Sequence, residues 1–340
     1  MTVYEYLNSR FPKLGVPGLS CCISYQNKLS TFNFGYSDIA TQKPIDDRSI
    51  FNIASIGKLI TSACILKLVE KGTCTLNTCV GELLPEIPGN WKSVKISHLM
   101  SHSSGIPNYT DVPEYWKESH LDVPKQRILD YVKNSELDFE SGSRWKYSNT
   151  GFYLLGLIIE KISGLNYFDF AKSLVASWKT GLEILKTDDR VVFPDKVTGY
   201  SFTSDKFIIP SYYSNSGTFS AGGFSARLQD FLDFETALFN GKILNASSLH
   251  VLITPFLNVD GSVLNGTDRV LDFAMTHGLF RFAKKGKVQV AHGGEILGYK
   301  SEYMRVVDDN FSVILATNAD CNFKSLEMLD KVYDLTVTNT

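Results

Sequence analysis

The chain has 340 residues, of which 44% are hydrophobic and 21% charged, and its formal net charge at pH 7 is −2. This composition is typical of a folded globular protein and excludes a disordered chain. No lysine or arginine cluster of the kind that tracks phosphates is present, and no apolar run approaches the roughly 20 residues that a membrane span needs. We therefore expect neither a nucleic-acid partner nor a membrane span.

Six cysteines are too sparse for a disulfide framework, so we expect free thiols. Cys21 and Cys22 are adjacent and should point to opposite faces of a strand, which prevents them from pairing with each other. The first residues lack a basic start with an apolar follow-up, so nothing in the chain as written predicts export. The expected location is the cytoplasm, or the periplasm or cell exterior if a leader has been removed.

Both ends of the chain carry strand patterns. A short helix over 3–11 precedes two strand-like runs at 19–25 and 29–34, which Asn27 and Lys28 separate as in a β-hairpin. Three further strands are predicted late in the chain, and a closing helix follows them. These late elements are expected at 287–291, 299–307, 311–317 and, for the helix, 324–334.

Helical patterns dominate between these ends. They cover 55–71, 96–101, 123–133, 150–162 and 167–176, with later helices near 226–239 and 246–252. The simplest assembly is an α+β fold in which both chain ends form one antiparallel sheet, flanked by the terminal helices, with an inserted, mostly helical subdomain.

Without a repeat or a long linker, residues 1–340 should form one domain. Its α/β part should cover about 1–54 and 215–340, and its helical subdomain about 55–214. A cleft is expected between the two parts.

The first chemical signal is the sequence S-I-G-K at 55–58, where the 55–71 helix begins. Residues three apart share a helix face, so the amine of Lys58 can reach the hydroxyl of Ser55. A lysine activates a serine if burial holds it neutral, and the Ser55 N–H at the helix start could face an oxyanion. Spacing alone is equally typical of an ordinary serine at a helix start. A second copy of the pattern, S-R-W-K at 143–146, has no helix directly after it.

The second signal is Y-S-N at 147–149, in a loop just before the 150–162 helix. A tyrosine near a lysine ammonium can relay a proton, and Asn149 offers a donor and an acceptor to an amide or carbonyl. The alternative is that Tyr147 is simply packed and Asn149 caps the helix.

The third signal is H-G-G-E at 292–295, after a predicted late strand. Its glycines let a ligand approach the backbone, which leaves the Glu295 N–H able to donate. A histidine followed by glycines is also a common turn feature.

Together these segments resemble the serine β-lactamase and penicillin-binding-protein superfamily, whose signatures are S-x-x-K, S-D-N and K-T-G. S-I-G-K stands for the first, Y-S-N for the second as in class C enzymes, and H-G-G for the third as in several esterases and D-Ala-D-Ala peptidases. Further similar segments are L-M-S-H-S-S-G-I-P at 99–107, A-G-G at 221–223 and T-N at 317–318. A literal K-T-G at 179–181 follows a helical pattern and is not taken as the third motif.

The resemblance implies that Ser55 attacks a carbonyl and that Lys58 and Tyr147 share the proton transfers. It also implies an oxyanion hole made by the N–H groups of Ser55 and Glu295. The substrate-binding residues that it implies are Asn149, His292, Gly293 and Gly294.

The histidine in the third motif has a consequence for the substrate. A mostly neutral His292 should bind a substrate carboxylate less well than the K-T-G lysine does, so strong β-lactamase activity is not expected. The prediction is a serine hydrolase that acts through an acyl-enzyme on a small ester, amide or D-amino-acid peptide. Two alternatives stay open: an acyltransferase that uses the same acyl-enzyme, and a non-catalytic module that binds a β-lactam or a peptidoglycan fragment.

No cofactor and no metal are predicted. His98 and His102 are four residues apart, but no third ligand accompanies them, and a structural pair under the cleft is the preferred interpretation. The expected partner is a small molecule or short peptide, and the sequence predicts no oligomeric state.

Overall fold

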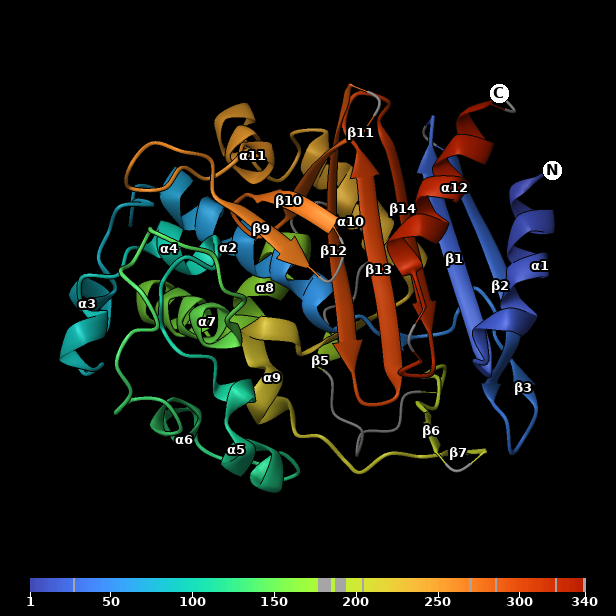
Figure 1. Ribbon diagram of the computed structural model, residues 1–340, viewed down its shortest axis with the longest axis horizontal. Helices are drawn as coiled ribbons and strands as arrows, with labels where there is room; N and C mark the ends of the chain where they lie inside the picture. The colour runs from blue at the N-terminus through green and yellow to red at the C-terminus, as the bar shows by residue number, and fades with distance from the viewer. Residues whose placement is uncertain are drawn as a thin grey trace.

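Strands from both ends of the chain meet in one nine-stranded sheet, with the order β3-β2-β1-β14-β13-β12-β11-β10-β9 (Figure 1). The structure is a computed structural model that describes residues 1–26, 28–176, 185–186, 194–203, 205–268, 271–284, 286–321 and 323–338. The strands of this sheet are β1 (Gly18–Tyr25), β2 (Lys28–Asp38), β3 (Lys43–Pro44), β9 (Asn265–Asp268), β10 (Leu271–Met275), β11 (Phe280–Lys284), β12 (Lys287–Ile296), β13 (Tyr299–Val306) and β14 (Phe311–Thr317).

Two smaller sheets and a set of helices complete the described fold. One sheet has the order β4-β8-β5, from β4 (Phe51–Asn52), β8 (Phe224–Ala226) and β5 (Leu185–Lys186), and the other pairs β6 (Ser201–Thr203) with β7 (Lys206–Ile208). The α-helices are α1 (Val3–Leu14), α2 (Lys58–Glu70), α3 (Val80–Leu83), α4 (Ile96–Met100), α5 (Pro113–Glu118), α6 (Lys125–Asp130), α7 (Asn149–Ser163), α8 (Tyr167–Ala176), α9 (Asn215–Gly222), α10 (Leu228–Phe239), α11 (Ala246–Ile253) and α12 (Ser325–Thr338). The short 3-10 helices are η1 (Ala54–Gly57), η2 (Gly89–Trp91) and η3 (Tyr109–Asp111).

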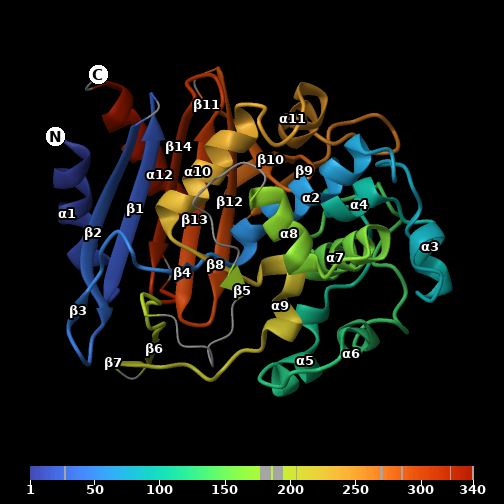
Figure 2. The same ribbon diagram turned by 180° about the vertical axis from the view of Figure 1, so that it is seen from behind.

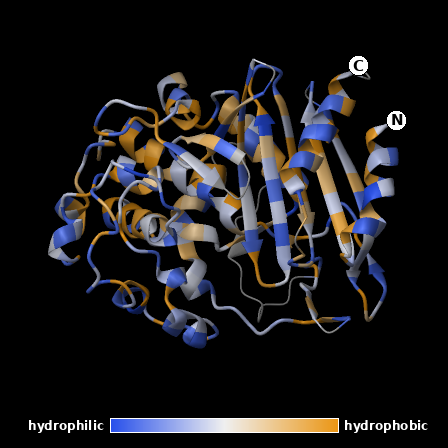
Figure 3. Cartoon of the chain, viewed as in Figure 1, coloured by the Kyte–Doolittle hydropathy of each residue, from blue (hydrophilic) through white to orange (hydrophobic). Residues whose placement is uncertain are grey.

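The pairing of β1 confirms the predicted fold. It lies antiparallel between β2 and β14, with Leu19 opposite both Phe34 and Thr317. Helices α1 and α12 cover one face of the sheet and α10 covers the other, as the two opposite views show (Figures 1 and 2). Both terminal helices carry hydrophobic and hydrophilic residues in turn (Figure 3), as expected for helices that bury one face.

The two cores on either side of the sheet separate the adjacent cysteines as predicted. Cys21 packs in the core under the terminal helices, whereas Cys22 belongs to the larger core on the α10 side. All six cysteines are free thiols. Among the described residues, no helix combines the length and apolar character that crossing a membrane requires.

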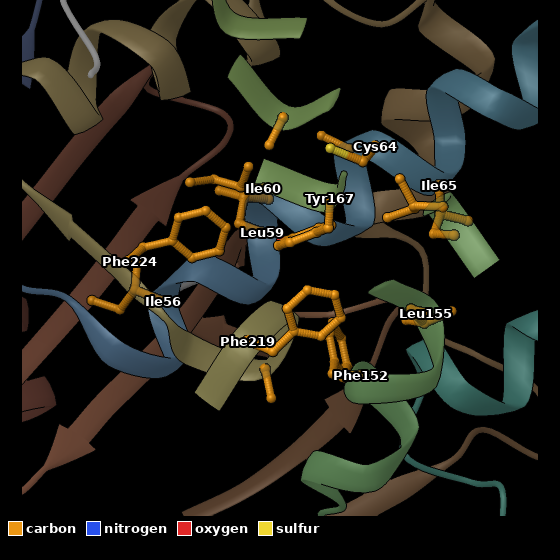
Figure 4. Packing of buried hydrophobic residues seen from close by; sticks show 14 of the residues in the cluster. Ile56, Leu59, Ile60, Cys64, Ile65, Phe152, Leu155, Tyr167, Phe219 and Phe224 are labelled. Atoms are coloured by element: carbon orange, nitrogen blue, oxygen red, sulfur yellow. The ribbon is translucent and has the colours of Figure 1, made fainter. Parts of the chain in front are cut away.

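Helix α2 runs through the centre of the larger core. It is apolar on all sides, so it is buried along most of its length rather than on one stripe. Its residues Leu59, Ile60 and Ile65 pack among aromatic side chains from α7, α8, α9 and β8 (Figure 4). The residue that begins this helix, Lys58, therefore enters the core together with it.

A buried ion pair fixes α10 to the sheet. Glu235 on α10 accepts a hydrogen bond from Arg305 Nη1 of β13 at 2.8 Å, and the two side chains are 0% and 4% exposed. Glu235 also accepts from the hydroxyls of Tyr303 and Ser312 at 2.7 and 2.8 Å. Because its charge is compensated on several sides, the carboxylate is tolerated in the core.

The structure differs from the prediction at several elements. The expected end of a strand at residue 291 is wrong, since β12 continues through the glycines, with Gly293 opposite Glu302 and Gly294 opposite Ser301. Strands β9 to β11 and helices α3, α5 and α9 were not predicted, because short elements give little periodicity. Asn27 of the predicted hairpin turn and the K-T-G at 179–181 lie outside the described residues.

Candidate active site

Ser55 lies in the 3-10 turn η1, which leads directly into α2. The preceding Ala54 has a φ of +45°, a value rare for residues other than glycine, and its N–H donates to Asn52 Oδ1 at 2.9 Å. The Ile53 carbonyl accepts from Ser301 Oγ of β13 at 3.0 Å. These bonds fix the turn against the large sheet, with Ser55 partly exposed to solvent.

The structure brings the predicted nucleophile, amine and phenol together. Lys58 Nζ lies 2.9 Å from Ser55 Oγ, and the Tyr147 hydroxyl donates to the same oxygen at 2.8 Å. Tyr147 comes from the segment before α7, far from Ser55 in the sequence. The convergence therefore depends on tertiary folding and not on local spacing alone.

Burial determines the charge of Lys58. The side chain is 0% exposed, and desolvation lowers the pKa of its amine well below the usual lysine value. Nζ also contacts Asn149 Oδ1 at 2.9 Å and the Ala221 carbonyl oxygen, two atoms that can only accept. In its neutral form the amine has two hydrogens, which these two acceptors can take, and its lone pair is then directed at the Ser55 hydroxyl.

Asn149 is the first residue of α7 rather than its cap. Ser148 is the cap, and its side chain accepts from the Gly151 N–H at 3.4 Å. This frees the Asn149 amide to bind Lys58 through Oδ1 and Thr110 through Nδ2, the latter at 3.3 Å. The alternative in which Asn149 serves as the helix cap is thus wrong, because Ser148 takes that position.

Strand β12 runs past the Ser55 turn. Its residues 287–291 pair with β11, and its residues 289–296 pair with β13, so within the described part of the chain the stretch from His292 onward has no strand paired on the β11 side. Strand β12 also contacts η1. A Cβ on Gly294 would overlap the Ile53 carbonyl oxygen, so glycine permits this close approach. The side chain of Glu295 is exposed. The oxyanion hole of the Ser55 and Glu295 N–H groups remains a prediction.

His292 is a neutral imidazole with a defined tautomer. Burial is the main cause that lowers the pKa of His292 to about 3, and Lys58 in its protonated form would lower it in the same direction. Its Nδ1 lies 2.6 Å from the Gly293 carbonyl oxygen, which can only accept, so Nδ1 carries the proton. Nε2 is therefore an acceptor. The ring lies between Phe280 and Tyr147, with centroid distances of 4.9 and 6.2 Å.

The second S-x-x-K copy forms no such pair. Ser143 Oγ donates to the Glu140 carbonyl at 2.6 Å, and Lys146 pairs with Asp138 at 2.7 Å. Among the described residues, no group of three or more histidine, cysteine, aspartate or glutamate side chains is placed to hold a metal.

Sequence reasoning did not assign two of these contacts. The Ala221 carbonyl at Lys58 and the Thr110 hydroxyl at Asn149 both lie at the site. The A-G-G segment at 221–223 was the available signal for the first, although a backbone acceptor needs no particular side chain. No local pattern indicated Thr110.

A family model described as "Beta-lactamase" matches residues 7–337. The chain belongs to the β-lactamase family. Proteins of this family are serine hydrolases, and the predicted superfamily is thereby confirmed.

Curated relatives of this family are similar over much of the chain. Penicillin-binding protein 4* of Bacillus subtilis (strain 168) is 27% identical over 303 residues, which cover 85% of this chain and 65% of that protein. The mitochondrial serine beta-lactamase-like protein LACTB of Mus musculus is 24% identical, over 67% of this chain and 55% of the relative. The chain thus spans less than two thirds of the length of these relatives.

Solved structures share the fold at low sequence identity. A penicillin binding protein from Bacillus halodurans matches with a TM-score of 0.84 and 20% identity, over 97% of this chain and 99% of the other. The D-amino acid amidase from Ochrobactrum anthropi SV3, complexed with L-phenylalanine amide, matches with a TM-score of 0.83 and 24% identity, over 99% and 98%. These similarities show the antiparallel α+β fold.

Proposed function

We propose that the chain hydrolyses a small ester or amide that presents no carboxylate to His292, D-amino-acid amides included, through an acyl-enzyme on Ser55. The observation that carries the proposal is the position of Ser55 Oγ, 2.9 Å from a buried amine and 2.8 Å from a phenol that donates to it. A neutral amine at this distance accepts the hydroxyl proton as the oxygen attacks.

In acylation, Ser55 Oγ bonds to the substrate carbonyl carbon while its proton passes to Lys58. The tetrahedral intermediate then collapses, the bond to the leaving amine or alkoxide breaks, and the Tyr147 hydroxyl gives that group a proton. Lys58 returns its extra proton to the phenolate. The transient ammonium faces the rings of Tyr147 and Phe152, with Nζ 4.9 and 5.3 Å from their centroids, which stabilises the charge.

In deacylation, water attacks the ester carbonyl and loses a proton to the amine of Lys58. The bond to Ser55 Oγ breaks, the serine regains its proton, and a carboxylic acid leaves. The N–H groups of Ser55 and Glu295 are the proposed donors to the oxyanion in both half-reactions.

The tautomer of His292 supports a substrate without a carboxylate at this position. Its Nε2 has no proton, so it offers a carboxylate neither a hydrogen bond nor a positive charge. A lysine at the same motif position would offer both. The names of two similar proteins, a penicillin-binding protein and a D-amino acid amidase, fit a substrate that contains an amide.

The test compares the wild type with Ser55→Ala and Ser143→Ala. We expect wild-type protein and Ser143→Ala to hydrolyse p-nitrophenyl butyrate and D-phenylalanine amide and to react with a fluorophosphonate probe, whereas Ser55→Ala does neither. Ser143→Ala is the matched control because it removes the serine of the other S-x-x-K copy. Labelling of Ser55→Ala at the wild-type rate would refute the assignment, and transfer of the acyl group to added amines without release of acid would replace hydrolysis by acyl transfer.

A further inference from the structure

His102 contacts three consecutive residues of the segment that delivers Tyr147. It follows α4 with a φ of +55°, and its carbonyl oxygen accepts from the Lys146 N–H at 3.0 Å. Its ring stacks on the ring of Tyr147, with centroids 4.4 Å apart and planes 29° apart. Its Nδ1 accepts from the Ser148 N–H at 3.1 Å. His102 thus holds the residues on both sides of the phenol, Lys146 through its carbonyl oxygen and Ser148 through its ring nitrogen, and its ring also packs on the phenol ring.

The ring of His102 is neutral and fixed in one tautomer. Burial is the main cause that lowers the pKa of His102 well below its usual value, and Lys58 or His292 in a protonated form would lower it in the same direction. Because Nδ1 accepts from a backbone N–H, the proton is on Nε2. The ring lies between Tyr147 and Phe152, whose centroid is 5.0 Å away. Because the His102 imidazole is uncharged, it does not repel the transient ammonium of Lys58.

The segment that carries Tyr147 needs such a support. Residues 142–148 contain no helix or strand, so no regular hydrogen-bond ladder fixes the phenol. The hydroxyl must nevertheless stay within hydrogen-bonding distance of Ser55 Oγ, because a displacement of about 1 Å costs on the order of 100-fold in rate.

We propose that His102 is a positioning residue, which holds the Tyr147 hydroxyl on Ser55 Oγ through the ring stack and the Ser148 N–H. The inference rests on the proposed function, since it assigns a role within that site. His102 acts through Tyr147 and does not contact the reacting atoms.

Two substitutions separate the two contacts. His102→Asn keeps an oxygen near the position of Nδ1 and tolerates the positive φ, but it removes the ring. His102→Phe keeps a ring and removes the acceptor. His98→Asn is the matched control, because His98 lies on α4, is also buried (9% exposed, against 1% for His102), and likewise accepts a backbone N–H through Nδ1, from Lys95 at 3.3 Å. Its ring neighbour is Phe256 and not Tyr147.

The experiment is a double-mutant cycle with Tyr147→Phe, read from kcat and KM on p-nitrophenyl butyrate and from the phosphonylation rate. We expect at least one His102 variant to lower kcat about 10- to 100-fold with KM changed less than about 3-fold, and His98→Asn to stay within about 2-fold. In the Tyr147→Phe background, the same His102 variant should change the rate by less than about 2-fold.

A loss of the same size in both backgrounds, or unchanged kcat in both His102 variants, would overturn the inference. A crystal structure of whichever variant folds gives a second reading that does not need activity. The phenol should move beyond hydrogen-bonding distance of Ser55 Oγ, and an unchanged 2.8 Å contact would contradict the proposal. Failure of the proposed function would appear differently, as turnover that survives Ser55→Ala.

Discussion

The charge state of Lys58 in the folded protein can be measured through its effect on stability. Unfolding exposes this buried amine to water, where it regains the usual lysine pKa of 10.5. Between the lowered pKa of the folded protein and pH 10.5, the unfolded chain therefore binds a proton that the folded chain does not bind, and this favours unfolding. The substitution Lys58→Met, which keeps the length of the side chain and removes the amine, eliminates this penalty.

The expected size follows from the number of protons. Where the folded chain has lost one proton and the unfolded chain has not, the free energy of unfolding rises by about 1.4 kcal/mol per pH unit. Between pH 8.0 and 9.5, the stability of the wild type relative to Lys58→Met should thus rise by about 2 kcal/mol. Groups that titrate equally in both proteins cancel in the difference.

Urea unfolding followed by circular dichroism, at four or five pH values in this range, gives the free energies for both proteins. The same samples should show kcat/KM lowered about 100- to 10,000-fold in Lys58→Met, which is the usual contribution of general base catalysis. A stability difference independent of pH would mean that Lys58 is protonated in the folded protein. The assignment of its lone pair to Ser55 would then be wrong.

Three further substitutions test other parts of the structure. Gly294→Ala should lower the free energy of unfolding in urea by about 1–3 kcal/mol and should lower kcat, because its Cβ would overlap the main chain just before Ser55. Gly89→Ala is the control, since its added Cβ meets open space, and it should change neither quantity. His292→Lys should raise kcat/KM for a D-Ala-D-Ala peptide relative to D-phenylalanine amide by about 10-fold or more. An unchanged ratio would contradict the inference that His292 binds a carboxylate poorly because its Nε2 carries no proton. Arg305→Met should destabilise by about 3–5 kcal/mol because it leaves the Glu235 carboxylate buried and unpaired, and adding Glu235→Gln should restore part of the loss.

Much of the site could be predicted from the sequence because its side chains come from short local patterns. The spacing of Ser55 and Lys58 already gave their contact, and the loop before α7 was the predicted source of Tyr147 and Asn149. The hairpin of β1 and β2 and the late strands β12 to β14 gave strong alternating patterns, so the fold class followed from them. The predicted roles of Asn149, His292 and the glycines in substrate binding remain predictions.

The parts that were missed depend on the backbone and on tertiary contacts. Lys58 finds an acceptor at Ala221 in α9, a helix interrupted at Phe219, whose φ of 37° and ψ of −124° are not helical. Nothing in the residue types predicts that interruption. Nor does the sequence reveal that Ala54 takes a left-handed conformation or that the ring of His102 lies on Tyr147, since both follow from packing in the finished fold.

The close contact between η1 and β12 determines when, during synthesis, the site around Ser55 can form. Ser55 leaves the ribosome long before the glycine-containing strand β12 that flanks it, and pairing of β1 with β14 requires segments that are remote along the chain. Helices such as α2 and α7 can form early, but the long-range sheet contacts come late. In a nascent polypeptide Ser55 therefore lies in an unassembled environment, and the hydrolysis proposed for the site would begin only when the distant strands have been made and docked.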